Sequence, residues 1–306
     1  MSGFDLTGRT ALITGGSYGL GVVWAHALAE AGADLALTAR SGELLEQVAA
    51  ELRTSTGRTV STHIGDVTSD ADVERVVGEA VAAHGHVDVL VNNAGVSENT
   101  GRSSEQTSSE HFRHAVDVDL VGVWSYAREV GRHMLGRGSG SIINIASICG
   151  MGATEFTNPA YHASKAAVIG LTRQLAAEWA DRGVRVNSIS PGFFMSEMVR
   201  EALEMMGTRP WIDSRNPMRR MGEHGELAGP IVFLASDAAS YVTGINLAVD
   251  GGHSTVIGAA QLQVPWQLWN QPGPIRPEAT YQGLTELPPG IPRQGVPGFH
   301  FPADPT

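Results

Sequence analysis

A glycine-rich turn near the start of the chain constrains the fold more than any other feature. An apolar run at residues 10–14 favours a short buried strand, and the stretch that ends near residue 31 favours a helix. The turn between them follows the spacing Thr-Gly-x-x-x-Gly-x-Gly and reads Thr14-Gly15-Gly16-Ser17-Tyr18-Gly19-Leu20-Gly21. Strand, glycine turn and helix in this order are typical of a site for a dinucleotide pyrophosphate, because free amides and the helix dipole face the anion. Glycines alone would fit an ordinary turn equally well, so the flanking elements decide the interpretation.

Strand-like and helix-like segments alternate without a break as far as about residue 250, which predicts one α/β domain. The strand segments are dense in Val, Ile and Ala with little polar alternation, as expected when helices cover both faces of a sheet. We therefore expect a Rossmann-type, doubly wound, parallel sheet. Its longest helices are predicted near residues 108–136 and 159–182. Its seven strands are predicted near residues 10–14, 34–38, 59–64, 87–92, 140–146, 184–190 and 245–249.

Two polar motifs come directly after predicted strands. Asn92-Asn93-Ala94-Gly95 follows the apolar run that begins at Val87, and Ser147 follows the run at residues 141–146. In an open parallel sheet, ligands bind at the carboxyl ends of the strands, near the point where the strand order reverses. The two motifs and the glycine turn are therefore expected to lie at the same edge.

Tyr161 and Lys165 are spaced four residues apart in a predicted helix, so their side chains should project from the same face. A phenol is a poor base at neutral pH because its reference pKa is about 10. An ammonium beside it favours the phenolate and lowers that pKa, which makes the phenol usable as a general acid or base. A lone pair with this spacing often arises by chance, but here it follows three other signals in order.

The chain resembles the classical short-chain dehydrogenase/reductase family. The resemblance extends from about Leu6 to about Ser254 and includes many motifs in the family's order. These are Thr14-Gly15 through Gly21, Asp66, Asn93-Ala94-Gly95, Ser147, Tyr161, Lys165, Asn187, Pro191-Gly192 and Val249-Asp250-Gly251-Gly252.

The resemblance implies a role for each member of the Ser-Tyr-Lys group. Tyr161 matches the residue that transfers the proton at the substrate oxygen, and Ser147 matches the hydroxyl that orients this oxygen. Lys165 matches the residue that lowers the phenol's pKa and binds the nicotinamide ribose. The family usually adds an asparagine where this chain has Asp119. Asp119 either takes part in the proton relay, where its charge would favour the ammonium form of Lys165, or is only a structural helix residue.

Cofactor preference depends on the end of the second strand. Relatives that prefer NAD commonly carry Asp where this chain has Ala39, and Arg40 and Ser41 follow. A guanidinium with no nearby carboxylate suits a 2′-phosphate, so NADP(H) is favoured and NAD(H) is the alternative. The presence of Tyr18, where many NADP-preferring relatives carry a basic residue, argues the other way. The full set of predicted cofactor contacts is Gly15, Ser17, Tyr18, Gly19, Leu20, Gly21, Arg40, Ser41, Asp66, Val67, Asn93, Ala94, Gly95, Tyr161, Lys165, Pro191, Gly192, Phe194 and Ser196.

The segment at residues 193–222 is irregular and rich in methionine, and it directly follows Pro191-Gly192. It is interpreted as a lid over the substrate, with a surface helical hairpin as the alternative. Four side chains in the predicted loops above the nicotinamide are the candidates for substrate contact, namely Glu155, Phe156, Phe193 and Trp211.

No metal site is predicted, because His63, His162 and His253 have no partners at metal-ligand spacing. Cys149 has no evident base beside it and is interpreted as a packing residue. As the only cysteine, it excludes an intramolecular disulfide and fits a reducing compartment. Neither a signal peptide nor a spanning apolar stretch is recognisable, so we expect a cytoplasmic protein. A net charge of −11 argues against nucleic acid or an anionic membrane as a partner.

The character of the chain changes near residue 256. Residues 256–306 contain ten of the fifteen prolines together with scattered aromatic residues. Proline at this density excludes a long helix or a central strand. We therefore expect a dehydrogenase/reductase domain at residues 1–255. The extension at 256–306 is expected to pack on that domain or on a neighbouring subunit. Because members of the family that the chain resembles are usually tetramers, we expect a homotetramer or a homodimer.

The sequence predicts an enzyme that interconverts a secondary alcohol and a ketone. One alternative is a dinucleotide sensor without catalysis, but such a protein should have lost Ser147, Tyr161 or Lys165. Another is a protein whose proline-rich extension binds a partner. Within the enzyme class, reduction of an activated double bond and epimerisation through a transient ketone also remain open.

Overall fold

The computed structural model describes residues 2–96, 104–153, 159–194, 213 and 216–255. The strands of this part form one seven-stranded sheet in the order β3-β2-β1-β4-β5-β6-β7. All six neighbouring pairs are parallel. The strands are β1 (Thr10–Thr14), β2 (Asp34–Ala39), β3 (Val60–Ile64), β4 (Val89–Asn92), β5 (Gly140–Ile145), β6 (Val184–Pro191) and β7 (Asn246–Val249).

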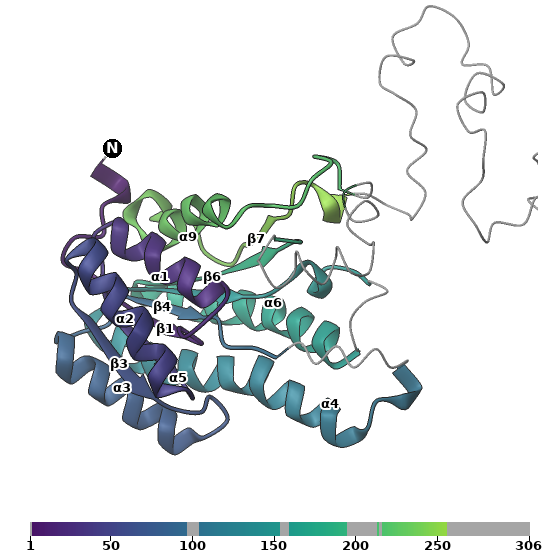
Figure 1. Cartoon of the computed structure of the whole chain (residues 1–306), viewed down its shortest axis with the longest axis horizontal. Helices are drawn as coiled ribbons and strands as arrows, with labels where there is room; N and C mark the ends of the chain where they lie inside the picture. Colours follow the sequence, from purple (N-terminus) through teal and green to yellow (C-terminus); the bar gives the residue numbers. More distant parts are fainter. Residues whose placement is uncertain (1, 97–103, 154–158, 195–212, 214–215, 256–306) are drawn as a thin grey trace, which may run out of the picture. The chain divides into compact units, whose positions relative to one another are not determined.

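Helices cover both faces of the sheet (Figure 1). α1, α2 and α9 contribute to the core on one face, and α3, α5 and α6 contribute to the core on the other. The α-helices are α1 (Leu20–Glu30), α2 (Gly42–Thr56), α3 (Asp70–His84), α4 (Ser109–Val116), α5 (Gly122–Arg137), α6 (Pro159–Trp179) and α9 (Ala228–Ala235). Shorter turns of helix are η1 (Ser2–Phe4), η2 (Ser104–Gln106), η3 (Asp117–Val121), η4 (Ile148–Gly150), η5 (Ala180–Arg182), η6 (His224–Leu227), η7 (Asp237–Ala239) and η8 (His253–Thr255).

The central strands are apolar throughout because both of their faces are covered. All five residues of β1 are buried, as are all four residues of β4. Consecutive residues of β1 belong to different clusters: Ile13 packs with α1 and α9, whereas Leu12 packs with α3 and α5. The predicted doubly wound, parallel α/β fold is confirmed.

Strand order places the reversal point between β1 and β4, which pair directly although two strands and three helices separate them in sequence. Strands β1, β2 and β3 follow one another outwards on one side of this point, and strands β4 to β7 follow one another outwards on the other. The glycine turn after β1 and the Asn93 motif after β4 therefore meet above the same crevice. This is where open α/β sheets bind their ligands.

The predicted element boundaries agree with the structure within about two residues. One difference is that β4 begins at Val89 and not at residue 87, because Asp88 uses its carboxylate to accept a hydrogen bond from Thr10 N at 2.9 Å. The other is that the predicted long helix near 108–136 contains a π-helical turn, η3, between α4 and α5. Single π-turns inside helices often occur at functional sites, and η3 carries Asp119.

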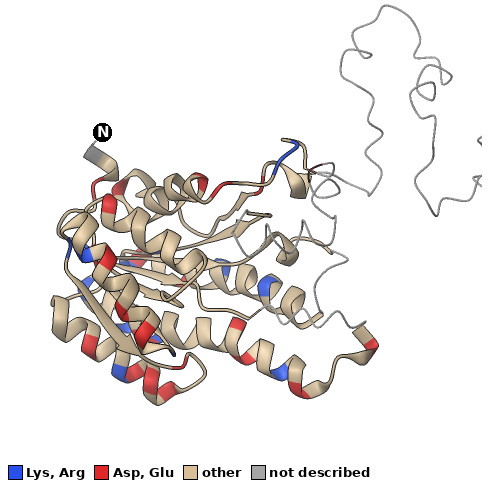
Figure 2. Ribbon diagram, in the orientation of Figure 1, with Lys and Arg blue, Asp and Glu red and all other residues tan. Residues whose placement is uncertain are grey.

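Several predictions fall on parts of the chain that the structure does not describe. Most of the predicted lid at 193–222 and the whole extension at 256–306 lie outside the described residues. The lid and the division of the chain near residue 255 therefore remain predictions. None of the described helices is both long and apolar enough to span a membrane. Figure 2 shows that acidic residues are spread over several surface helices, in keeping with the net charge of −11.

Candidate functional site

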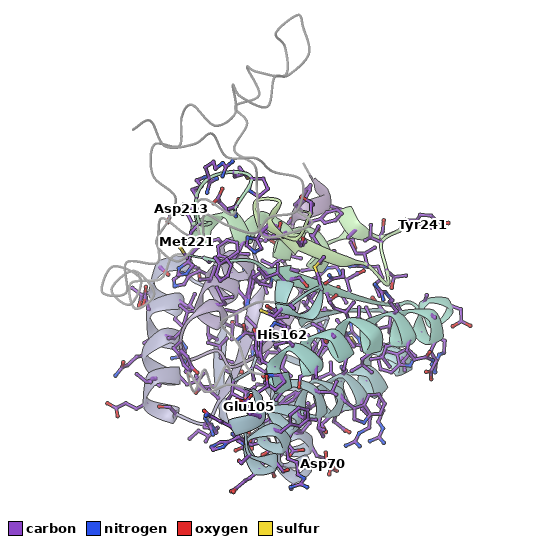
Figure 3. The ribbon with its side chains drawn as sticks, turned by 90° about the vertical axis from the view of Figure 1, so that its right-hand side faces the viewer. Asp70, Glu105, His162, Asp213, Met221 and Tyr241 are labelled. Atoms are coloured by element: carbon purple, nitrogen blue, oxygen red, sulfur yellow. The ribbon has the colours of Figure 1, made fainter. Side chains whose placement is uncertain are left out.

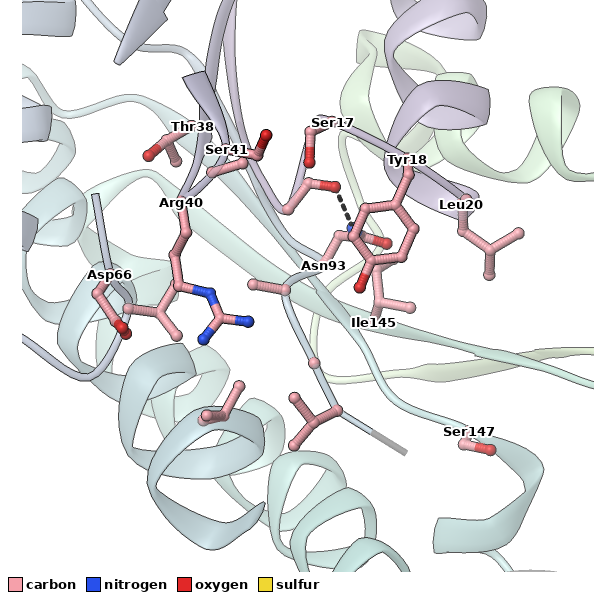
Figure 4. Close-up of a pocket in the computed structure, with 18 of the residues that line it drawn as sticks. Ser17, Tyr18, Leu20, Thr38, Arg40, Ser41, Asp66, Asn93, Ile145 and Ser147 are labelled. Atoms are coloured by element: carbon pink, nitrogen blue, oxygen red, sulfur yellow. Dashed lines mark hydrogen bonds between the residues drawn. The ribbon is translucent and has the colours of Figure 1, made fainter. Parts of the chain in front are cut away.

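A cavity of about 460 Å³ opens at the carboxyl edge of the sheet, above the reversal point between β1 and β4. This volume lies in the range of cofactor and small-molecule sites. Figure 4 shows Arg40 and Asp66 at one end of the cavity and Ser147 at the other, with the glycine turn between them. The predicted residues that line it are Gly15, Ser17, Tyr18, Gly19, Leu20, Arg40, Ser41, Asp66, Val67, Asn93, Ala94, Gly95, Ser147, Tyr161, Lys165, Pro191 and Gly192.

The glycine turn packs so closely that it excludes side chains. Gly15 adopts a positive φ of 67°, and a Cβ added there would lie 2.9 Å from the Cα of Ala94. A Cβ on Gly21, the second residue of α1, would collide with the carbonyl oxygen of Gly15. Gly21 does not line the cavity, so its part in the site is to let α1 approach the turn. Backbone exposed in this way at a helix N-terminus fits a pyrophosphate group.

Asn93 ties the glycine turn to the loop after β4. Its side-chain amide donates to the carbonyl oxygens of Thr14 and Gly15 at 3.0 and 3.2 Å. The hydroxyl of Thr14 in turn accepts the backbone N–H groups of Asn93 and Ala94, both at 3.0 Å. The indole N–H of Trp24, a completely buried residue of α1, donates to Asn93 Oδ1 at 2.9 Å. The sequence did not indicate this role for Trp24, because its partner lies 69 residues away.

At the end of the cavity near β2, Arg40 and Asp66 lie on the same side (Figure 4). Burial tends to raise the pKa of Asp66, but hydrogen bonds from Thr68 and the charge of Arg40 outweigh burial and lower it. Asp66 therefore carries a negative charge within electrostatic reach of the guanidinium. The expectation that Arg40 has no carboxylate nearby was wrong: Asp66 is distant in sequence, and the fold of β3 against β2 brings it close.

At the opposite end, Ser147, Tyr161 and Lys165 come together. Tyr161 and Lys165 lie on α6, as predicted, and the Lys165 ammonium is 5.5 Å from the centre of the tyrosine ring. Ser147 follows β5 at the start of η4, where its hydroxyl accepts the N–H of Cys149 at 3.1 Å. Lys165 is only 4 % exposed and donates to the carbonyl oxygen of Ile145 at 3.0 Å. The predicted group thus exists as a cluster on two elements.

Burial controls the acidity of this cluster. It raises the pKa of Tyr161 above its ordinary value near 10; a hydrogen bond with Ser147 opposes the change, while Cys149 and Asp119 add to it. Burial likewise lowers the pKa of Lys165, although Asp119 and Cys149 favour its charged form. The expectation that Lys165 brings the tyrosine pKa below its usual range is therefore not met by the protein groups alone, because desolvation has the larger effect.

Asp119 does not line the cavity but lies directly behind its wall. It is completely buried, and its Oδ1 accepts the backbone N–H of Val96 at 2.8 Å. Gly95 separates it from the cavity. Asp119 is therefore close to the cluster without facing a ligand directly.

The remaining residues singled out from the sequence do not line the cavity or lie outside the described residues. Phe194 pairs through its backbone with Gly222 and packs against the core, so it does not line the cavity. Phe193 forms an edge-to-face contact with His253, their ring centres 5.3 Å apart. Asn187 is completely buried; its side chain donates to Val242 O and accepts from Ile245 N, so it ties β6 to the segment before β7. The residues predicted from loops that the structure does not describe are Glu155, Phe156, Ser196 and Trp211.

Several residues that line the cavity were missed from the sequence. They are apolar or small side chains at strand ends and on adjacent elements, a type that motif patterns do not single out. Their place follows only from strand register, which aligns the ends of β2, β4 and β5. They are Thr38, Ala39, Leu44, Gly65, Val96, Val118, Ile145 and Ala146.

A doubly wound sheet with a glycine-lined cavity at its reversal point is a dinucleotide-binding architecture. A hydroxyl, a phenol and an ammonium at one end of that cavity can orient an oxygen and move a proton to or from it. The fold and the site together define the class of dinucleotide-dependent oxidoreductases.

Comparison with known proteins gives the family within this class. The family model described as "Enoyl-(Acyl carrier protein) reductase" matches residues 15–254. The galactitol 2-dehydrogenase (L-tagatose-forming) of Cereibacter sphaeroides is 40% identical over 82% of this chain and 97% of its own. A short-chain type dehydrogenase/reductase from Mycobacterium marinum has a TM-score of 0.76 and 36% identity, covering 82% of this chain and 97% of the other. The gluconate 5-dehydrogenase of Burkholderia cenocepacia, solved with NADP and tartrate, has a TM-score of 0.77 and 37% identity, covering 83% and 98%.

The chain belongs to the short-chain dehydrogenase/reductase family, and it is an NAD(P)-dependent oxidoreductase acting on alcohol or carbonyl groups. The resemblance recognised from the sequence motifs is thereby confirmed.

Proposed function

We propose that Tyr161 is the general acid and base of this oxidoreductase, that Ser147 orients the reacting oxygen, and that Lys165 supports the phenol. The observation that carries the proposal is the convergence of these three side chains at one end of the glycine-lined cavity. Nicotinamide, when bound, supplies or accepts the hydride. The protein then has to hold the oxygen of the substrate and exchange one proton with it.

The chemistry of each group fits its part. In carbonyl reduction Tyr161 donates its proton to the substrate oxygen, and in alcohol oxidation it accepts one. Its hydrogen bond with Ser147 supports the proposal that the two oxygens contact one substrate oxygen together. Lys165, which donates to the Ile145 carbonyl at 3.0 Å, lies beside the ring, and in its charged form it favours the transient phenolate.

We propose NADP(H) as the preferred cofactor, with NAD(H) as the alternative. Arg40 lies at the end of β2 and lines the cavity together with Ser41, and no acidic residue occupies position 39. A guanidinium and a hydroxyl suit a 2′-phosphate, which Asp would repel. The gluconate 5-dehydrogenase relative, which contains NADP, supports the same preference. Asp66 opposes it in part, because its charge offsets that of Arg40.

The activity is tested by following nicotinamide absorbance with alcohols and ketones and both cofactors. Because the relatives are named for galactitol and gluconate, polyols and sugar acids belong at the head of the screen. Tyr161→Phe should reduce turnover at least ~10²-fold, as expected for loss of the general acid and base. Turnover by Tyr161→Phe at the rate of the unmodified protein would refute the assignment.

Cofactor preference is tested with Arg40→Ala. Loss of a charge-assisted contact should raise the KM for NADP(H) about ten-fold or more and leave the KM for NAD(H) nearly unchanged. Arg132→Ala is the matched control, because Arg132 is an exposed residue of α5 that pairs only with Glu129 among the described contacts. A preference for NAD(H) in the unmodified protein would overturn the use made of Arg40.

Reduction of an activated double bond is a second candidate, favoured by the description of the matching family model as an enoyl reductase. The named dehydrogenases among the relatives favour the alcohol–ketone reaction instead. Product analysis distinguishes the two, since only the latter changes the oxidation state at a C–O carbon.

We also propose a homodimer or homotetramer. Phe112, Val121 and Trp124 expose large apolar surface on α4, η3 and α5, and β7 is an edge strand with only partly buried residues. Figure 3 shows Tyr241 projecting away from the ribbon, and it is fully exposed. Sedimentation should give a dimer or tetramer for the protein and a smaller species for Trp124→Glu.

We further propose a cytoplasmic location. The single cysteine supports it, because a reducing compartment does not favour disulfides, and cell fractionation tests it.

A further inference from the structure

A buried negative charge lies behind the Ser-Tyr-Lys cluster. Asp119 has no exposed surface, and it lies in the π-helical turn η3, which packs against α6. A Cβ added to Gly95 would lie 2.8 Å from Asp119 Oδ1 and 3.4 Å from Lys165 Nζ. The carboxylate and the ammonium therefore border the same small space, which only a glycine at position 95 leaves open.

Two groups beside Asp119 can stabilise a negative charge on its carboxylate. The backbone N–H of Val96 donates to Oδ1 at 2.8 Å, and such a bond stabilises a carboxylate more than a neutral acid. The ammonium of Lys165, 4 % exposed, supplies the compensating positive charge. Lys165 keeps its own fixed acceptor, the Ile145 carbonyl, independently of Asp119. A buried carboxylate without such partners would be protonated instead.

Two titratable groups on neighbouring elements raise the pKa of Tyr161 by charge, Cys149 of η4 and Asp119 of η3. On the helix of Tyr161 itself, Lys165 Nζ lies 5.5 Å from the centre of the tyrosine ring. Lys165 favours the phenolate, whereas a negative charge at Asp119 disfavours it. Burial raises the pKa of Tyr161, and the charges of Cys149 and Asp119 raise it further. An asparagine at position 119 would have the same size and would still accept from Val96, but would lack the charge.

Resting on the proposed function of Tyr161, we propose that Asp119 is a positioning residue whose charge offsets that of Lys165. Tyr161 then retains its proton to higher pH than it would beside an asparagine. Near neutral pH the site is set to donate a proton, which favours carbonyl reduction, and alcohol oxidation requires more alkaline conditions. The structural role of the residue, acceptance of the Val96 N–H, is separate from this effect of charge.

The test compares Asp119→Asn with Asp117→Asn. Asp117 lies two residues away on the same π-turn but is exposed, so its replacement removes the same charge from a solvated place. Asp119→Asn should move the rising limb of the pH profile for alcohol oxidation to lower pH by about one unit, the size expected for one charge close to a buried group. Asp117→Asn should leave the profile in place, and thermal unfolding checks that both variants fold.

A second measurement does not depend on turnover. Tyrosinate absorbance of the free protein is titrated in the Asp119 and Asp119→Asn backgrounds, with the matching Tyr161→Phe proteins as blanks. The difference signal should appear at lower pH in Asp119→Asn. No displacement would overturn the proposal, since Asp119 would then be uncharged or only structural. Displacement to higher pH would also overturn it, because Asp119 would then act mainly by keeping Lys165 protonated. Loss of activity in Tyr161→Phe alone tests the proposed function, so the two failures remain distinguishable.

Discussion

At the scale of single residues, Trp24 shows how the core and the cofactor site depend on each other. Its ring is completely buried among the residues of one core cluster, and its N–H reaches Asn93 at 2.9 Å. Asn93 in turn holds the carbonyl groups of Thr14 and Gly15. The indole thus fixes the orientation of an amide that shapes the cavity, and the position of the glycine turn depends on both.

Trp24→Phe should raise the KM for the cofactor several-fold while changing kcat little, because the variant loses the hydrogen bond that orients Asn93. It should also lower the free energy of unfolding by about 1–3 kcal/mol, from one unsatisfied acceptor and a smaller ring. Trp179→Phe is the control, since Trp179 is 6% exposed in the other core cluster and packs against Gly131. Steady-state kinetics and thermal unfolding of both variants are compared. An unchanged cofactor KM in Trp24→Phe would contradict the coupling.

At the scale of elements, glycines inside helices have opposite roles depending on what faces them. Gly78 lies on α3 with no heavy atom within 4 Å of where a Cβ would be. Gly131 lies on α5, and a Cβ there would come within 2.8 Å of the Trp179 ring. Gly131 therefore sets how closely α5 approaches α6, whereas Gly78 only weakens its helix.

Gly78→Ala should stabilise the protein by about 0.5–1 kcal/mol, because alanine loses less backbone entropy in a helix. Gly131→Ala should destabilise it by about 1–3 kcal/mol, because the added methyl group overpacks the contact with Trp179. Urea unfolding of both variants gives the two free energies. If Gly131→Ala proved as stable as the unmodified protein, the close contact would not limit the approach of α5 to α6.

At the scale of the whole molecule, histidines and hydrogen-bonded carboxylates both make the protein less stable as pH falls. Burial lowers the pKa of His84 and of His133, so both bind a proton less readily in the folded protein. Hydrogen bonds from Arg220 and from the backbone of Glu223 lower the pKa of Glu226 to about 2, and a hydrogen bond from Arg75 lowers that of Asp72. Each of these groups binds protons more readily when the chain is unfolded.

Stability should therefore decline as pH falls below about 7. The decline should begin near the ordinary pKa of histidine, about 6.5, as His84 and His133 gain protons on unfolding, and it should steepen below about 4.5, where the carboxylates follow. Thermal unfolding between pH 8 and pH 4 measures this. His84→Gln should reduce the slope near pH 6, whereas His111→Gln, on the exposed surface of α4, should not. Stability that rose on acidification would contradict the assignment.

Local sequence determined the elements and the main parts of the site. Apolar runs with little polar alternation predicted the strand boundaries within about two residues, because a strand covered on both faces admits few polar groups. The spacing of Tyr161 and Lys165 on one helix is a property of a short segment, so the sequence alone predicts it. The order of these motifs along the chain then indicated both the shared edge of the sheet and the family.

The tertiary structure decided what depends on burial and on contacts between distant segments. The pairing of β2 with β3 brings Asp66 close to Arg40, and α6 brings Lys165 next to Asp119 of η3. Desolvation raises the pKa of Tyr161 although its neighbour is a cation, and no sequence spacing reveals how much water a side chain loses. Residue spacing fixes which groups share a segment, whereas packing fixes the dielectric around them and therefore their charge.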